Sequence, residues 1–262
     1  MESLKILFIG NSFSLDTAEY TVEIAHALGI SNVKVTSLYI GGCSIALHYD
    51  NAMQDLPAYR YYTNTGEGWD HVHEHKLSDA VREDDWDWIV FQQGTNDGSR
   101  YTSPESYAQL TPLIRHVKQM ASPHARIAFN LTWMGESTRQ HHEILSYGGD
   151  IAAMRQKLEE VTREVILGNP LIDLLVPTGT AIENARTSAI GLLTRDCYHL
   201  SMDKGRYIAA LTFISVITDL PVDGIDWCPA GVDAYAKQVA IESANHAKAH
   251  PLEITPSSLF KR

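Results

Sequence analysis

Short apolar runs, separated by stretches with helical spacing, recur along the first two thirds of the chain. Each run is rich in β-branched or large apolar residues, as is typical of strands that are buried on both faces. The five runs are Leu4–Ile9, Val33–Tyr39, Trp88–Gln92, Arg126–Leu131 and Leu171–Val176. Because strands that alternate with helices form parallel sheets, the pattern predicts an α/β fold with helices on both faces of the sheet.

Apolar residues at three- and four-residue steps predict the helices between and after these runs. Gly29 ends the first of them, and Ser103 with Pro104 forms an N-cap and N1 pair. Pro112 is expected to kink or divide the helix that follows. Further helices are expected at about 150–167, 203–219 and 231–249. No repeat, low-complexity tract or linker divides the chain, so we expect a single domain over residues 1–262.

Composition and charge disfavour several classes of partner. The 262 residues are 44% hydrophobic and 20% charged, which allows a substantial core. With 21 basic and 32 acidic residues the net charge is −11. Nonspecific binding to nucleic acid depends on Lys and Arg at the phosphates, and adsorption to anionic lipid needs the same charges. We therefore expect a small-molecule or carbohydrate substrate and no nucleic-acid or membrane partner, with the oligomeric state left open.

The start of the chain and the cysteines bear on the compartment. A strand begins directly after Met1-Glu2-Ser3, and no apolar run reaches the ~20 residues that span a bilayer. The chain as given is therefore expected to be cytoplasmic, or secreted or periplasmic if a signal sequence has been removed. Cys43, Cys197 and Cys228 lack Cys-x-x-Cys spacing, so neither a disulfide framework nor a zinc ribbon is predicted.

Four short motifs point to nucleophilic catalysis. A serine at the end of the first strand lies where open α/β sheets place their chemistry. A histidine can remove its proton, and an aspartate three residues before that histidine can orient the ring. We therefore expect Ser12, His199 and Asp196 to be the nucleophile, the base and the orienting carboxylate. The motifs are Gly10-Asn11-Ser12-Phe13-Ser14, Gly41-Gly42-Cys43-Ser44, Gly94-Thr95-Asn96-Asp97 and Asp196-Cys197-Tyr198-His199.

Together these motifs resemble the sequence blocks of the SGNH hydrolases, also called GDSL-like esterases and lipases. Asn11 stands where the family often has Asp, so the chain resembles a less characterised branch with Gly-Asn-Ser-Phe-Ser in its first block. The resemblance implies an oxyanion hole formed by the backbone N–H groups of Ser12 and Gly42 and the side-chain amide of Asn96. Gly41 is the alternative to Gly42. No metal or other cofactor is implied.

Several of these residues admit a second interpretation. Ser12 could cap the first helix, and Asn96 with Asp97 could form an ordinary turn. The histidines of residues 71–75 could bind a metal, with all three on one face only if the segment is a strand. Its flanks favour instead a loop that leads into a helix, and hence a polar surface. His141-His142 is expected in an exposed loop.

Aromatic and cysteine side chains near the motifs give further expectations. Phe13 and Trp133 are expected to contact substrate, Trp133 by stacking, because it follows the fourth strand at the catalytic edge. Trp86 and Trp88 are expected in the core. Cys43 and Cys197 lie inside two motifs, as reduced packing residues or, alternatively, as a redox-sensitive pair. Their spacing in the sequence does not determine the distance between the two thiols.

The expected fold is a three-layer α/β/α sandwich with a five-stranded parallel sheet in the flavodoxin-like order 2-1-3-4-5. The expected function is metal-independent hydrolysis of small acyl esters, with acetyl esters of carbohydrates preferred. The family resemblance also covers lipases, lysophospholipases and thioesterases. Two further alternatives are a catalytically inactive carbohydrate-binding module with the same fold and a metal-dependent hydrolase built on the histidines of residues 71–75.

Overall fold

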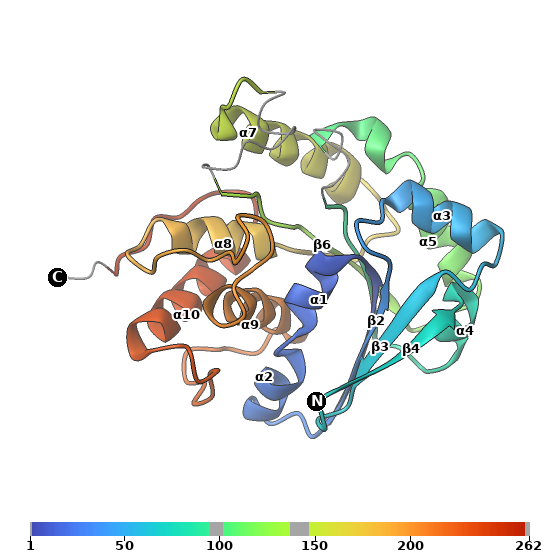
Figure 1. Cartoon of the computed structure of the whole chain (residues 1–262), viewed down its shortest axis with the longest axis horizontal. Coiled ribbons are helices and arrows are strands. Elements are labelled where there is room, and N and C mark those ends of the chain that lie inside the picture. Colours follow the sequence, from blue (N-terminus) through green and yellow to red (C-terminus); the bar gives the residue numbers. More distant parts are fainter. Residues whose placement is uncertain (1, 95–101, 137–146, 260–262) are drawn as a thin grey trace.

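A twisted, mostly parallel sheet forms the centre of the protein (Figure 1). The computed structural model describes residues 2–94, 102–136 and 147–259. Within these residues the sheet has seven strands in the order β4-β3-β2-β1-β5-β6-β7. Their bounds are β1 Ser3–Gly10, β2 Asn32–Tyr39, β3 Tyr59–Asn64, β4 Trp69–His75, β5 Trp88–Phe91, β6 Arg126–Asn130 and β7 Leu174–Val176.

The parallel part of the sheet has the expected order. β2, β1, β5, β6 and β7 pair in parallel, which is 2-1-3-4-5 when these five strands alone are counted. Alternate side chains of β1 enter opposite cores: Leu4, Ile6 and Phe8 face one layer of helices, and Leu7 and Ile9 face the other. Apolar residues on both faces explain why these strands are continuous apolar runs in the sequence.

The expectation of a five-stranded sheet was wrong, because an antiparallel hairpin extends the sheet beyond β2. β3 pairs with β2 and β4 pairs with β3, both antiparallel. β4 is an edge strand whose residues are exposed or half-buried, so its sequence is polar and lacks the apolar pattern of a buried strand. Residues 71–75 belong to this strand, so the expectation of a loop there was wrong. The polar sequence of the strand explains why the strand was not predicted.

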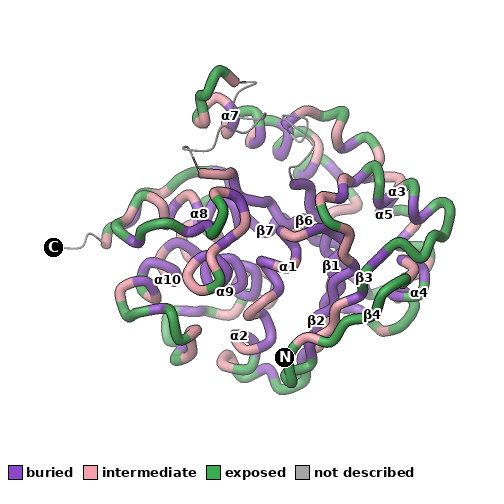
Figure 2. Tube along the Cα trace, viewed as in Figure 1, coloured by how far each residue is buried: buried purple, intermediate pink, exposed green. Residues whose placement is uncertain are grey.

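Two layers of helices cover the sheet, as the three-layer prediction requires (Figures 1 and 2). One layer comprises α1 Ser12–Ala18, α2 Thr21–Ala27, α8 Thr178–Arg186, α9 Lys204–Thr218 and α10 Ala234–Ala249. The other comprises α3 Ile45–Met53, α4 Leu77–Arg82, α5 Leu110–Lys118 and α7 Ile151–Val161, with the short helices η2 Pro104–Tyr107 and η3 Thr162–Leu167. α9 is buried along most of its length, because it packs between the sheet and its neighbours α8 and α10.

Several helix boundaries differ from those expected. The single helix predicted before Gly29 is divided into two helices, α1 and α2. α2 ends near Gly29, whose φ is 86°. Ser103 and Pro104 begin the short helix η2, and α5 starts separately at Leu110. Pro112 therefore lies in the first turn of α5, where a missing N–H removes no intrahelical hydrogen bond.

In the part of the chain that the structure describes, no helix has the length and hydropathy needed to cross a membrane.

Candidate active site

A sharp turn between β1 and α1 presents Ser12 at the carboxyl edge of the sheet. Asn11 is the N-cap of α1, and its side-chain oxygen accepts a hydrogen bond from the Phe13 N–H at 3.1 Å. Ser12 is thus the first helical residue, and capping does not occupy its hydroxyl. A Cβ at Gly10 would lie 2.1 Å from the Ser14 hydroxyl, so the turn requires glycine there.

The side chains of Ser12, His199 and Asp196 form a continuous hydrogen-bonded chain. His199 Nε2 lies 2.8 Å from Ser12 Oγ, and His199 Nδ1 lies 2.7 Å from Asp196 Oδ2. The other carboxylate oxygen, Oδ1, accepts from the backbone N–H groups of Tyr198 at 3.0 Å and His199 at 2.6 Å. Cys197 has a φ of 63°, and this left-handed residue bends the segment so that Asp196 can reach the His199 ring.

The electrostatics of this chain suit proton transfer. Partial burial by itself raises the pKa of Asp196, but hydrogen bonds from the His199 side chain and backbone outweigh it and hold that pKa below its ordinary value. An ionised carboxylate accepts a hydrogen bond from the Nδ1–H group of His199, and Nε2 is then free to accept the Ser12 proton. The arrangement therefore has the donor and acceptor sequence that activates a serine hydroxyl.

Asp16 lies one turn after Ser12 on α1 and binds the segment that carries His199. Its buried carboxylate accepts from the Leu200 N–H at 2.8 Å, from Arg195 at 3.0 Å and from Arg206 Nε at 2.8 Å. The Arg195 guanidinium also donates to the Leu200 carbonyl. Sequence reasoning did not find this role, although the spacing of four residues from Ser12 on a helix was a usable signal.

The second and third motifs are held against the first by Asn11. Its side-chain N–H₂ donates to the carbonyl of Cys43 at 3.0 Å and to the carbonyl of Gly94 at 3.1 Å. Gly42 has a φ of 62°, a conformation that favours glycine. Gly42 therefore lies in a left-handed turn directly before Cys43, whose carbonyl Asn11 contacts. Asn96 and Asp97 lie outside the described residues.

The two aromatic residues expected at the substrate have a packing role instead. Phe13 and Trp133 are each only 1% exposed. Their ring centroids are 4.6 Å apart, and Tyr198 packs edge-on against Phe13 at 4.9 Å. Trp133 Nε1 donates to the Tyr198 carbonyl at 2.9 Å, so the indole supports the segment that carries His199. This burial argues against the expected contact of either ring with substrate.

The histidines of β4 do not converge. The residues that the structure describes contain no group of three or more His, Cys, Asp or Glu side chains placed to hold a metal ion. His71 and His73 pack edge to face at 5.4 Å, while His75 packs on Tyr61 at 4.5 Å. Glu74 has a φ of 60°, and the strand pairing is irregular there, so the simple alternation of side chains is broken. His141-His142 lies outside the described residues.

Cys43, Trp86 just before β5 and Trp88 at the start of β5 are packing residues. All three cysteines are free, so Cys43 and Cys197 form no disulfide in this structure. Burial raises the pKa of the Cys43 thiol to about 12, which keeps it protonated and unreactive at neutral pH. Trp86 is fully buried and Trp88 is 3% exposed, which confirms their expected place in the core.

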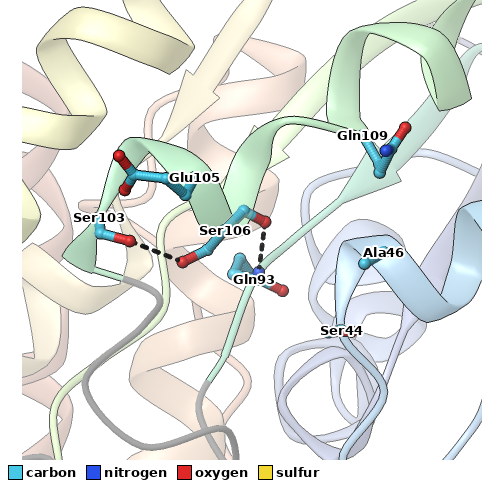
Figure 3. Close-up of a pocket in the computed structure, with 7 residues that line it drawn as sticks. All are labelled: Ser44, Ala46, Gln93, Ser103, Glu105, Ser106 and Gln109. Atoms are coloured by element: carbon cyan, nitrogen blue, oxygen red, sulfur yellow. Dashed lines mark hydrogen bonds between the residues drawn. The ribbon is translucent and has the colours of Figure 1, made fainter.

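A cavity of about 500 Å³ lies between α3, the end of β5 and η2 (Figure 3). Gln93 lies at its centre in the view, with Ser103 and Glu105 on one side and Ser44 and Ala46 on the other. The volume is within the range of about 300–1,000 Å³ that small-molecule sites occupy. Gln93 and Ser44 neighbour the two carbonyls that Asn11 contacts, so the cavity is close to the Ser12 segment.

Comparison with known proteins identifies the family. A family model described as "Domain of unknown function (DUF4886)" matches residues 5–247. The chain belongs to the DUF4886 family. A DUF4886 family protein from Bacteroides uniformis has 30% sequence identity to it and a TM-score of 0.89, over 97% of each chain. No curated protein matches the chain in sequence.

More distant structures share the fold of this DUF4886 protein. A catalytic mutant of Axe2, an acetylxylan esterase from Geobacillus stearothermophilus, matches with a TM-score of 0.51 and 17% identity, over 88% of this chain and 99% of that chain. A putative platelet activating factor from Streptococcus pneumonia matches with a TM-score of 0.50 and 19% identity, over 81% and 82%. At these identities the likeness concerns the fold.

Proposed function

We propose that this DUF4886 protein is a serine hydrolase of the SGNH type that cleaves esters of small acyl groups. The observation that carries the proposal is the hydrogen-bonded chain from Asp196 through His199 to Ser12 at the carboxyl edge of the sheet. A serine used only for structure has no need of an imidazole at 2.8 Å that is itself oriented by a carboxylate.

In the proposed reaction, Ser12 Oγ attacks the ester carbonyl carbon while His199 Nε2 takes the hydroxyl proton. Asp196 stabilises the imidazolium that results. The tetrahedral intermediate collapses to the acyl-enzyme, and His199 returns the proton to the departing alcohol. Water then attacks the acyl-enzyme by the reverse sequence, which releases the acid and restores Ser12. The backbone N–H groups of Ser12 and Gly42 and the amide of Asn96 are proposed to bind the oxyanion, each donor being worth about 2.7–4 kcal/mol.

Acetyl esters of carbohydrates are the proposed substrates. The shared fold of an acetylxylan esterase is consistent with this class. The cavity beside the Ser12 segment supports it independently, because its lining side chains are almost all polar. An extended acyl chain could form no hydrogen bond with these side chains, whereas the hydroxyl groups of a sugar could.

A panel of nitrophenyl esters of increasing chain length, with acetylated sugars beside it, tests the chemistry and the substrate class together. We expect the wild type to favour the shortest acyl groups and to retain its activity in EDTA. A fluorophosphonate should label Ser12 and no other serine. A preference for long acyl chains would indicate a thioesterase or lysophospholipase, and failure of Ser12 to react would indicate a noncatalytic binding module. Loss of activity in EDTA, restored by zinc, would indicate metal-dependent hydrolysis.

A further inference from the structure

We propose that the cavity between α3, β5 and η2 is the subsite for the alcohol half of the ester, and that it receives a neutral polyhydroxyl alcohol of about one sugar unit. The inference rests on the proposed esterase function of Ser12. It goes further by assigning a place and a charge preference to the part of the substrate that leaves first.

The position of the cavity follows from the contacts of Asn11. Ser44 in one wall directly follows Cys43, and Gln93 in the floor directly precedes Gly94. The carbonyls of Cys43 and Gly94 both accept hydrogen bonds from Asn11, the residue before Ser12. The cavity therefore neighbours the turn that carries Ser12, and on this ground the alcohol half of an ester attacked by Ser12 is assigned to it.

The cavity is preorganised, because Gln93 links its two walls. Gln93 is 6% exposed, and its Oε1 accepts from the Ile45 N–H at the start of α3 at 3.1 Å. Its Nε2 donates to the Ser106 carbonyl in η2 at 3.0 Å (Figure 3). Both ends of this buried amide therefore hydrogen-bond to backbone groups, one at the start of α3 and one in η2. These two bonds fix the distance between the walls of the cavity. A ligand that fits this gap loses little free energy to reorganisation of the protein.

The side chains that line the cavity are small or polar. Every lining side chain except Ala46 carries a hydroxyl, amide or carboxylate group, and none is aromatic or a large aliphatic group. Hydrogen bonds from its own backbone N–H and from Ser103 hold the pKa of Glu105 below its ordinary value. The Glu105 carboxylate therefore accepts hydrogen bonds from hydroxyl groups at neutral pH and repels an anionic alcohol. Sugar hydroxyls can donate hydrogen bonds to the Glu105 carboxylate, whereas this carboxylate repels the carboxylate of a uronate.

Ala46 offers a steric test of the site. Ala46→Tyr should fill the cavity from α3, and Leu47→Tyr, at the next residue, is the matched control because Leu47 is 44% exposed and does not line the cavity. The substrates are methyl acetate, whose alcohol is too small to need the subsite, and an acetylated methyl xyloside. We expect Ala46→Tyr to lower kcat/KM for the xyloside by about tenfold or more and to leave methyl acetate nearly unchanged. Leu47→Tyr should change neither.

Glu105 offers a test of the charge preference. The measurement is the ratio of kcat/KM for the acetylated xyloside to that for an acetylated methyl uronate. Glu105→Gln should lower this ratio by several-fold, because it removes the charge that repels the uronate. The control is Glu67→Gln, which removes the same charge from the loop between β3 and β4, at the opposite edge of the sheet.

The outcomes separate this inference from the proposed function. If the wild type hydrolyses neither substrate, the esterase proposal fails and the subsite fails with it. If methyl acetate is hydrolysed and Ala46→Tyr acts on the xyloside no more than Leu47→Tyr does, only the subsite is overturned. An unchanged ratio in Glu105→Gln would overturn the charge preference.

Discussion

At the scale of single residues, Asn11 determines how the motifs around Ser12 fit together. Its oxygen accepts from the Phe13 N–H, and its nitrogen donates to the carbonyls of Cys43 and Gly94. The side-chain amide of asparagine has one carbonyl oxygen and two N–H groups, and Asn11 uses all three in hydrogen bonds. Aspartate, common at this position among SGNH hydrolases, could cap α1 equally well but could donate to neither carbonyl.

Asn11→Asp should therefore lower kcat while the helix cap remains. Each buried carbonyl left without a donor costs about 1–3 kcal/mol, and a carboxylate beside it adds repulsion. We expect kcat for a short nitrophenyl ester to fall by about tenfold to a hundredfold, with a smaller change in KM. Wild-type kcat in Asn11→Asp would show that these two contacts do not position the reacting groups.

Ser12→Ala and His199→Ala should each reduce kcat by about a thousandfold or more, because the nucleophile and its base act as one unit. For the same reason the double variant should be scarcely worse than either single variant. Steady-state kinetics measure the three losses, and thermal unfolding checks that the fold is retained. Losses that multiply in the double variant would mean that the two side chains act independently, contrary to the proposed mechanism.

At the scale of elements, the buried carboxylate of Asp16 joins three pieces of the chain. It belongs to α1, it binds the Leu200 N–H and Arg195 in the segment that carries His199, and it binds Arg206 on α9. The turn that positions His199 is thereby fixed on the same helix that begins at Ser12. Asp16 touches none of the reacting groups in this structure, so its role is positioning.

Asp16→Asn should slow catalysis through this connection. Removing one partner of a buried ion pair typically costs about 3–5 kcal/mol of stability, so the melting temperature should fall. Well below that temperature, kcat and the rate of fluorophosphonate labelling of Ser12 should also fall, with KM little changed. Arg195→Lys keeps the positive charge beside Asp16 and should be milder in both respects. A normal labelling rate in folded Asp16→Asn would limit its role to stability.

At the scale of the whole molecule, the strand order brings distant motifs to one edge. The first three motifs follow β1, β2 and β5, and these strands are neighbours in the order β2-β1-β5. Parallel strands have their carboxyl ends at the same edge, so the first residues of three motifs far apart in the sequence meet there. The fourth motif reaches this edge because α9, which follows it, packs against α1.

The stability of the whole fold should depend on pH in a way that reports Asp196. Its pKa in the folded state is below the ordinary value of 3.8, so its ionised form stabilises the fold above that value. This contribution is lost as the pH falls through the folded-state pKa. The difference in free energy of unfolding between wild type and Asp196→Asn should therefore shrink below about pH 4. Urea unfolding over a pH series measures it, and a difference that grows in acid would contradict the argument.

The local sequence determined the parallel strands, most helices and the motifs, because buried strands are continuous apolar runs and helices have periodic apolar faces. It did not predict β3 and β4. Side chains of an exposed edge strand lack that pattern, and pairing with β2 is a long-range choice that no local segment specifies. The same limit applies to the histidines of β4, whose alternation is broken by a residue with positive φ.

The sequence by itself determined which chemical groups the chain could bring to a site: a serine after β1, and an aspartate and a histidine three residues apart before α9. Only the tertiary structure decided that Ser12 and His199 lie within hydrogen-bonding distance, that Asn11 and Asp16 hold the surrounding turns, and that Phe13 and Trp133 are buried. These are distances between residues up to 190 positions apart. Such distances depend on how the layers of helix and sheet pack together, and local residue patterns do not contain that information.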